Sequence, residues 1–267
     1  MTLQRIKPVT EQPRVTQFFD EFAPSYFSRY DIRDQDGHSF RIRKQRVLEE
    51  FKKLPAGSTV LDVGCGPGVM VRELLDAGYR VIATDIALAM IEECRKQFPR
   101  NDRLELIVAP AEHLPLPAAS VDGIMAMGLV EYLKDDAEVL REFARILKPQ
   151  GLIAITLPHE ASPSRLWDRL TKWLARPLVL LVRGLRGKVP TDVLHREYRL
   201  NEYHALCETS GIHLTHTVFY NMKVFLRPLD RLFPAAGVRC SESLERFART
   251  PFLRRLGTGF IVFGKKK

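Results

Sequence analysis

The sequence has few cysteines and no long apolar run. Its four cysteines, Cys65, Cys94, Cys207 and Cys240, form no Cys-x-x-Cys pair and have no histidine at metal-ligand spacing. This argues against a disulfide framework and against a bound metal, and favours reduced thiols. No run of 18 apolar residues occurs, and the first 14 residues lack the apolar core of a signal peptide. We therefore expect a cytoplasmic protein.

The composition otherwise is that of a globular protein with an excess of positive charge. Hydrophobic residues make up 45% of the 267 residues and charged residues 27%, which excludes wholesale disorder. The formal charge is +9. This charge favours an anionic partner, which could be a membrane surface, a nucleic acid or an acidic substrate.

Strand and helix patterns alternate through the first part of the chain. We predict strands at 58–64, 79–86, 104–109, 121–127 and 151–158, and helices at 39–54, 70–78, 87–98 and 135–147. A helix at 201–211 and strands at 212–220 and 259–264 follow. Repeated strand–helix–strand units predict a doubly wound, mostly parallel sheet with helices on both faces and a ligand crevice at the carboxyl ends of its strands.

This pattern is interrupted after Pro158. Between Ser162 and Pro190, seven Lys or Arg residues oppose one acid, Asp168, a net charge of +6, and leucines recur at helical spacing. We interpret this segment as a helical cap and divide the chain into a lid helix region (1–38), a cofactor-binding core (39–158), the cap and substrate insertion (159–200) and a completion of the sheet (201–267).

The stretch VLDVGCGPGV at 60–69 places an acid before a glycine turn. In a dinucleotide fold such a turn binds a diphosphate, and a carboxylate at Asp62 would repel it. The glycines also follow a GxGxG spacing rather than GxGxxG. The turn therefore fits a ligand with a cationic group beside a ribose, such as S-adenosylmethionine. Alternatively, the glycines form only a tight strand-to-helix turn.

A second acid follows the next predicted strand. Asp85 lies 23 residues after Asp62, where its carboxylate could accept hydrogen bonds from ribose hydroxyls. It could also cap the helix that follows, and the two roles are compatible.

The motifs VLDVGCGPG, ATDIA, AEHLPLP, SVDGIMAM and REFARILKPQGLIAI occur in one order. In this order the chain resembles the class I S-adenosylmethionine-dependent methyltransferases, in their small-molecule branch (methyltransferase type 11/25-like), from about residue 48 to 158 and in the closing strands. The resemblance implies a Rossmann-like, seven-stranded sheet of the α/β class with an added α-helical cap. It also implies S-adenosylmethionine as methyl donor and S-adenosylhomocysteine as product.

The resemblance assigns the cofactor site residue by residue. It implies that Asp85 binds the ribose, that Ile86 and the segment Ala111–Glu112 lie beside the adenine, and that Met127 and Gly128 form the wall beneath the sulfonium. It also implies that the methionine part is held by the residues of the glycine turn, which are Asp62, Gly64, Cys65, Gly66 and Gly68. One position departs from the family pattern, because Pro110 stands where relatives often have an aspartate.

The N-terminal segment resembles a lid helix of the same branch. Its Phe-Asp-x-x-Ala-x-x-Tyr pattern recurs as Phe19, Asp20, Ala23 and Tyr26. The resemblance implies that Tyr26 lies over the cofactor. The alternative is that these aromatic residues simply pack the helix onto the sheet.

Methyl transfer from a sulfonium is a direct displacement, so positioning of the acceptor supplies most of the rate. A general base helps when the acceptor is a hydroxyl or an acidic carbon. Our candidates are His195, Glu131 and Tyr132, followed by His159 and His216. The alternative for His195 is a structural hydrogen-bonding role, which is the commoner one for a lone histidine. His216 is expected to be packed or on the surface.

The cap is expected to select the acceptor. Its leucines, with Trp167 and Trp173 and a basic face, predict an apolar pocket for a hydrophobic or lipid-like molecule and a peripheral contact with anionic lipid at the inner face of the membrane. Alternatively, the leucines close over the sheet. A second interpretation is an RNA-directed methyltransferase that binds RNA through the basic cap. The many apolar residues of the cap and the absence of base-modifying motifs from the sequence argue against it. A third is a non-catalytic relative that only binds the cofactor.

Overall fold

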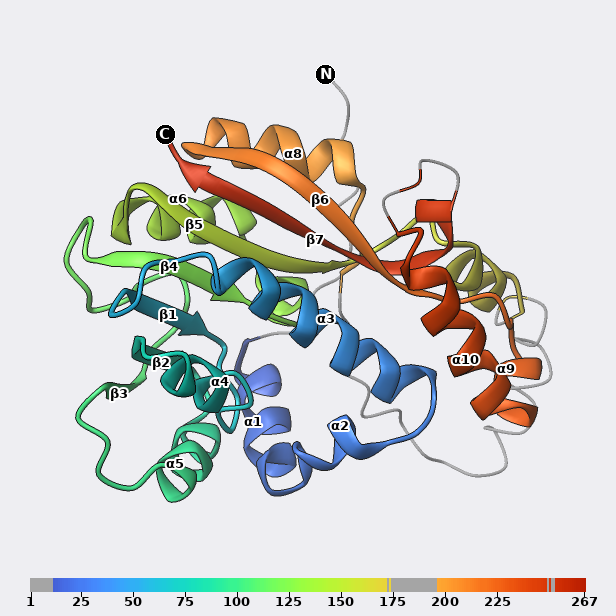
Figure 1. The fold of residues 1–267 in the computed structure, drawn as a ribbon, viewed down its shortest axis with the longest axis horizontal. Coiled ribbons are helices and arrows are strands. Elements are labelled where there is room, and N and C mark those ends of the chain that lie inside the picture. The colour runs from blue at the N-terminus through green and yellow to red at the C-terminus, as the bar shows by residue number, and fades with distance from the viewer. Residues whose placement is uncertain (1–11, 172, 174–195, 249, 251–252) are drawn as a thin grey trace.

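The computed structural model describes residues 12–171, 173, 196–248, 250 and 253–267. Its centre is one seven-stranded sheet in the order β3-β2-β1-β4-β5-β7-β6 (Figure 1). The strands are β1 Thr59–Val63, β2 Arg80–Asp85, β3 Leu104–Val108, β4 Val121–Ala126, β5 Leu147–Pro158, β6 Ile212–Met222 and β7 Gly257–Lys266.

Helices precede, connect and follow these strands. The α-helices include α1 Gln12–Phe22, α2 Ser28–Asp31, α3 Gln35–Phe51, α4 Val71–Asp76, α5 Leu88–Gln97, α6 Asp136–Ile146, α8 Leu200–Thr209, α9 Leu229–Leu232 and α10 Pro234–Glu245. The short 3-10 helices are η1 Ala23–Ser25, η2 Val130–Tyr132 and η3 Leu253–Leu256.

The strand directions confirm the predicted doubly wound sheet. Strands β1, β2, β3, β4 and β5 pair in parallel, whereas β7 is antiparallel to both β5 and β6. Strand order reverses beside β1, between β2 and β4. The carboxyl ends of β1 and β4 therefore meet at the position where open sheets of this kind bind ligands.

Two hydrophobic cores lie on opposite faces of the sheet. Side chains alternate along a strand, so Leu61 and Val63 pack with α6 and α8, while Val60 packs with α3 and α4. Figure 1 shows α3 on one side of the sheet and α6 and α8 on the other. The sheet is therefore covered on both faces, as the long apolar strands predict.

The N-terminal helix α1 docks onto the start of α5. The Asp20 carboxylate accepts a hydrogen bond of 3.0 Å from the Ala89 backbone N–H, and Phe19 and Tyr26 pack against Met90. Helix α1 thus lies over the carboxyl ends of the strands, where a lid is expected.

Two features of the helices differ from the predictions. Helix α3 begins at Gln35, four residues before the expected start, because the Asp34 carboxylate caps it by accepting hydrogen bonds from the N–H groups of Asp36 and Gly37. Helix α10 was not predicted at all. It packs against β6 and α3, and its buried residues are Gly237, Ser241 and Glu245, so its sequence carries little apolar periodicity.

The described part of the cap is short. Residues 163–171 are helical and Trp173 is 67% exposed; the remaining leucines and basic residues predicted for the cap lie outside the described residues. Among the described residues, none of the helices combines the length and the apolar character that a membrane crossing needs.

Candidate cofactor and acceptor site

A small cavity lies at the carboxyl ends of β1, β2 and β4, beneath α1. Its volume is about 60 Å³, room for about two water molecules. It is lined by Val15, Phe19, Tyr26, Gly64, Gly66, Asp85, Ile86, Met90, Met127, Gly128, Leu129, Tyr132 and Leu133. Eight of the residues predicted for the site, seven for the cofactor and Tyr132 for catalysis, therefore meet at one place.

The glycine turn after β1 is tied to the end of β2. The N–H groups of Gly64 and Cys65 donate to the Thr84 carbonyl at 2.7 and 3.0 Å, and the Gly66 N–H donates to the Asp85 carboxylate at 2.9 Å. Gly64 and Gly66 have φ of 68° and 55°, which glycine adopts without the penalty of a Cβ. The turn and the second acid therefore form one unit.

The close approaches at these glycines are to the protein itself. A Cβ on Gly66 would lie 3.8 Å from the Tyr26 ring, so this tyrosine covers the turn. A Cβ on Gly68 would lie 2.6 Å from Cys94 Sγ. Gly68 is thus required for packing of the turn against α5, whereas the resemblance had assigned it to the methionine part of the cofactor.

Two carboxylates with raised pKa values lie behind and beside the turn. Asp62 is 2% exposed and its Oδ2 has no hydrogen-bond partner. Burial, reinforced by the nearby Asp85 charge, raises the pKa of Asp62 from 3.8 to about 7. Burial also raises the pKa of Asp85. Hydrogen bonds from the N–H groups of Ala87, Gly66 and Ile86 act to lower this pKa, but the effect of burial is larger. A cation placed here would relieve both carboxylates.

The end of β4 forms the wall on the other side. The Gly128 N–H donates to Thr156 Oγ1 at 2.8 Å, which fixes the strand end against β5. Tyr132 in η2 packs edge-on against Phe19 of α1 at 5.2 Å between ring centroids. Glu131 is 7% exposed, its Oε2 has no hydrogen-bond partner, and burial raises its pKa.

Other predicted site residues do not line this cavity. Ala111 is buried and Glu112 is half-buried, and neither is among the residues that line the cavity. Asp62, Cys65 and Gly68 form the layer behind the turn rather than its surface. Glu131 likewise lies behind the lining. His195 lies outside the described residues.

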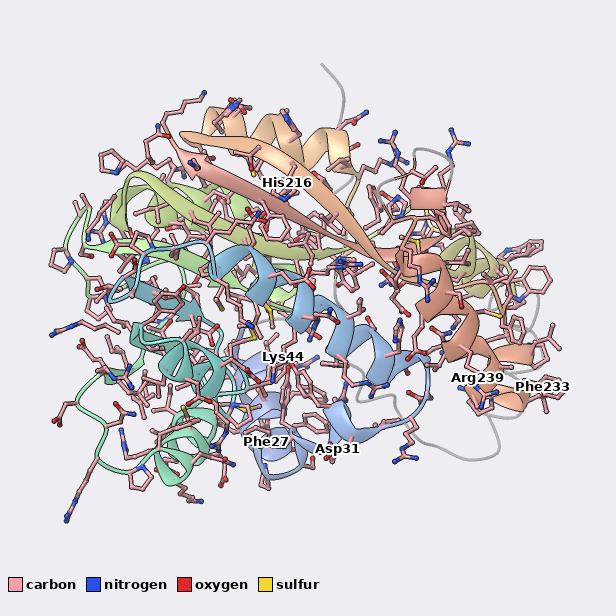
Figure 2. The ribbon with its side chains drawn as sticks, viewed as in Figure 1. Phe27, Asp31, Lys44, His216, Phe233 and Arg239 are labelled. Atoms are coloured by element: carbon pink, nitrogen blue, oxygen red, sulfur yellow. The ribbon has the colours of Figure 1, made fainter. Side chains whose placement is uncertain are left out.

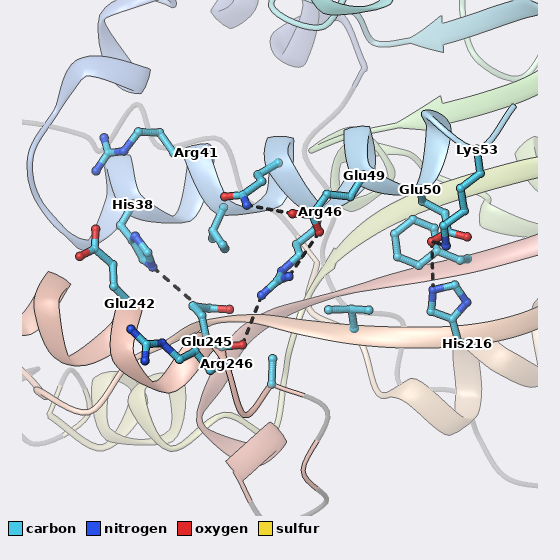
Figure 3. A pocket seen from close by; sticks show the side chains of 15 residues that line it. His38, Arg41, Arg46, Glu49, Glu50, Lys53, His216, Glu242, Glu245 and Arg246 are labelled. Carbon is cyan, nitrogen blue, oxygen red and sulfur yellow. Dashed lines mark hydrogen bonds and ion pairs between the residues drawn. The ribbon is translucent and has the colours of Figure 1, made fainter. Parts of the chain in front are cut away.

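The two other candidate histidines are placed elsewhere. His159 donates from Nδ1 to the Gly257 carbonyl at 2.9 Å, and burial lowers its pKa. His216 stacks on Phe263 and lies 3.6 Å from Glu50 in a groove of about 900 Å³ between α3 and α10 (Figure 3). Neither side chain lines the cavity beneath α1.

Three side chains outside the predicted site surround the outer end of the β4 wall. Arg43 of α3 is 8% exposed, and Tyr30 and Tyr220 face its guanidinium at hydrogen-bonding range. One signal in the sequence could have found Arg43. It precedes Val47 by four residues and Phe51 by eight, so it shares the buried face of α3.

Comparison with known proteins is consistent with this geometry. Residues 61–155 match the methyltransferase domain family. The malonyl-acyl-carrier-protein O-methyltransferase of Yersinia pestis is 31% identical over 152 residues, which cover 57% of this chain and 53% of that protein. The aklanonic acid methyltransferase of a Streptomyces species is 34% identical over 150 residues, or 54% and 65% of the two chains.

Residues 61–155 therefore carry a methyltransferase domain, and about half of the chain is similar to S-adenosylmethionine-dependent methyltransferases. An S-adenosylmethionine-dependent methyltransferase from Mesorhizobium loti shares the fold, with a TM-score of 0.55 and 19% identity over 83% of this chain and 96% of that one. The cyclase SpnF shares it as well, with a TM-score of 0.62 and 16% identity over 97% of both. This chain spans between half and two thirds of the length of these curated relatives.

Proposed function

We propose that this protein binds S-adenosylmethionine in the cavity beneath α1 and transfers its methyl group to a hydrophobic small molecule by direct displacement. The observation that carries the proposal is Asp62. Its carboxylate is buried, has an oxygen without a hydrogen-bond partner and lies near a second carboxylate. Such a group is costly unless a cation is brought to it, and the α-ammonium of this ligand is such a cation.

The remaining residues fit the other parts of the ligand. Asp85 and Ile86 line the cavity at the end of β2 and would hold the ribose and flank the adenine, with Ala111 and Glu112 beside them. Met127 and Gly128 would lie against the sulfonium, with Tyr26 above the turn. When bound, this ligand supplies an electrophilic methyl group on positively charged sulfur.

Helix α1 would act as the lid. The cavity of about 60 Å³ is far smaller than a nucleoside ligand needs, and Phe19 and Tyr26 of the α1–η1 segment supply part of its lining. Admission of the cofactor therefore requires this segment to move outward. The contact that holds it is a hydrogen bond from the Ala89 N–H to Asp20 and packing against Met90.

The acceptor is proposed to be a hydrophobic or lipid-like molecule, methylated on oxygen or carbon. The curated relatives support a small-molecule acceptor, because their names refer to a malonyl-acyl-carrier protein and to aklanonic acid. Tyr132 at the cavity and Glu131 behind it are the proposed acid–base groups, together with His195. Burial raises the pKa of Glu131, the direction that favours the protonated form of its carboxyl group.

We also propose a peripheral contact with an anionic membrane, through the described part of the cap and the α9–α10 segment. Leu166 and Leu170 are 51% and 48% exposed, and Trp173 is 67% exposed. Phe233 is also exposed and projects with Arg239 from the α9–α10 end (Figure 2). Apolar side chains beside basic ones are what an interfacial surface requires. Sedimentation with phosphatidylglycerol vesicles but not with phosphatidylcholine vesicles is the expected result.

The proposed function is tested by methyl incorporation together with cofactor binding. Protein incubated with labelled S-adenosylmethionine and solvent-extracted small molecules should yield labelled product. Asp85→Asn should weaken S-adenosylhomocysteine binding about 10- to 100-fold in calorimetry, because charged hydrogen bonds to the ligand are lost. Asp76→Asn, on the exposed side of α4, is the matched control. Equal affinity of the Asp85 variant and the native protein would show that the ribose assignment is wrong.

A further inference from the structure

A second pocket lies between the start of α8 and η3. Its volume is about 590 Å³, which is in the range of sites that hold a small organic molecule. Among the described residues, it shares no lining residue with the cavity beneath α1. It is therefore a separate site, which the proposed methyl transfer leaves unused.

Positive charge predominates in the lining of this pocket. Arg199, Arg254 and Arg255 line it, and Glu202 supplies the one acidic side chain among the described lining residues. The Glu202 carboxylate is 72% exposed and lies 3.7 Å from Arg199, which also donates a hydrogen bond of 3.1 Å to Glu160. In the described part of the chain, Arg254 and Arg255 form no ion pair. The two η3 arginines are thus cations that an anionic ligand would neutralise.

The first turn of α8 adds hydrogen-bond donors to this charge. The helix begins without a side-chain cap, and the backbone N–H groups of Leu200, Asn201 and Glu202 have no acceptor among the described residues. All three residues line the pocket. Free N–H groups at the start of a helix carry partial positive charge and bind phosphate groups. The lining therefore fits an anion.

A buried histidine faces the same pocket. His159 is 8% exposed and belongs to the lining. Its Nδ1 lies 2.9 Å from the Gly257 carbonyl oxygen, which can only accept, so Nδ1 carries a hydrogen. Its Nε2 has no hydrogen-bond partner within the described ranges. Burial lowers the pKa of His159, the direction that leaves Nε2 without a hydrogen and able to accept one.

A ring nitrogen in this state selects among anions. It forms a hydrogen bond with an anion that still carries a hydrogen, whereas it opposes its lone pair to an anion that carries none. A phosphate monoester loses its second proton only near pH about 6, so one hydrogen can be shared between a phosphate oxygen and Nε2 near neutral pH. Sulfate and phosphate diesters have no such hydrogen. The pocket should therefore prefer the monoester.

We propose that this pocket binds a phosphate monoester. Arg254, Arg255 and the free N–H groups of α8 hold the charged oxygens, and His159 Nε2 shares the remaining hydrogen. Phe219 and Leu200 also line the pocket and offer apolar surface to the organic part of the ligand. A soluble phosphorylated metabolite and the headgroup of phosphatidic acid both present this chemistry.

Calorimetry near neutral pH and at low ionic strength measures the preference. Inorganic phosphate, phenyl phosphate, sulfate and the diester methyl phenyl phosphate are titrated into the full chain. We expect saturable binding of phosphate and phenyl phosphate, and binding of sulfate and of the diester weaker by about tenfold or more, since one charged hydrogen bond is lost. Sulfate is at least as negatively charged as phosphate at this pH, so charge alone would not produce this order. Equal or tighter binding of sulfate, or no saturable binding of phosphate and phenyl phosphate, overturns the proposal.

Variants of the lining assign the binding to this pocket. Arg255→Gln should lower the affinity for phenyl phosphate about tenfold, and Arg141→Gln, exposed on α6 and outside the lining, is the matched control. His159→Asn keeps a donor near the position of Nδ1 but removes Nε2, so phenyl phosphate and the diester should bind it equally. Thermal melting checks that each variant is folded, and Arg255→Gln decides if His159→Asn is not. Unchanged phenyl phosphate affinity in Arg255→Gln would overturn the proposal.

Vesicles identify the source of the monoester. Sedimentation is compared between vesicles of phosphatidic acid, a monoester, and of phosphatidylglycerol, a diester, at equal surface charge. A preference for phosphatidic acid that Arg255→Gln abolishes would support the proposal with a lipid headgroup as ligand. Binding of phenyl phosphate without that preference would support it with a soluble metabolite.

The cofactor site provides the last control. S-adenosylhomocysteine should bind with the same affinity in the presence and absence of saturating phosphate, because the two pockets have separate linings. Displacement of S-adenosylhomocysteine by phosphate would place the anion in the cavity beneath α1 and overturn the proposal. Absence of S-adenosylhomocysteine binding would refute the proposed function alone, since the phosphate titrations decide this inference independently.

Discussion

Replacement of Asp62 by asparagine should stabilise the free protein at alkaline pH. The pKa of Asp62 is about 7 in the folded chain against an ordinary 3.8. The folded state therefore retains a proton that the unfolded state has released, and stability falls as pH rises from about 4 to 7. An asparagine side chain does not titrate in this range, so the Asp62→Asn variant should lack this loss.

The magnitude follows from the two pKa values. Each pH unit between them costs the folded state about 1.4 kcal/mol, so the two units from pH 5 to pH 7 cost about 2 to 3 kcal/mol. The advantage of Asp62→Asn over the native protein should grow by that amount between pH 5 and pH 8. Any cost of burying the amide is the same at every pH and cancels from this difference.

Urea unfolding at pH 5, 6, 7 and 8 and constant ionic strength measures this difference. Asp122→Asn is a control of opposite character, because Lys148 and the Thr59 N–H hold the pKa of Asp122 below its usual range. Its effect on stability should not change between pH 5 and 8. Parallel stability curves for the native protein and Asp62→Asn would refute the burial argument. Asp62→Asn should also bind S-adenosylhomocysteine more weakly than the native protein does, so its stability and its cofactor affinity should change in opposite directions.

Two further predictions concern local structure. Gly68→Ala should destabilise the fold by about 2 to 4 kcal/mol, because its Cβ would lie 2.6 Å from Cys94 Sγ at a φ of 92°. Gly57→Ala, at a φ of 79° with nothing within 4 Å, should cost only about 1 kcal/mol. Equal losses of melting temperature in the two variants would show that the contact with Cys94 is unimportant. Asp34→Ala should lower the free energy of unfolding in urea by about 1 kcal/mol through loss of the α3 cap. Asp135→Ala, which removes the corresponding cap of α6, should have a similar effect. An unchanged unfolding midpoint would argue against the cap.

The parts of the fold that sequence predicted are those with contiguous patterns. The strands were predicted from short apolar or alternating patterns, such as the apolar run at 151–158 in β5 and the alternation in β6. Helix α10 was missed because its buried residues, Gly237, Ser241 and Glu245, are not apolar. The Glu245 carboxylate is buried because it accepts a hydrogen bond from the Met222 N–H at 3.1 Å, and no local pattern encodes such a tertiary partner.

The candidate site divides in the same way. Asp62 and Asp85 lie in the last residues of β1 and β2, and Gly128 lies just after β4. The parallel sheet brings these strand ends together, so motif spacing was enough to propose them. Arg43 and Tyr220 come from segments separated by about 180 residues of chain. They meet only because α3 packs on β6. A charged residue on the buried face of a helix was the one local sign of this cluster.

The most direct test of the central claim is calorimetry of the native protein with S-adenosylhomocysteine and, separately, with NAD⁺. The account predicts saturable binding of S-adenosylhomocysteine and none of NAD⁺, because the Asp62 carboxylate behind the glycine turn attracts an ammonium and repels a diphosphate. Binding of NAD⁺ without binding of S-adenosylhomocysteine would contradict it.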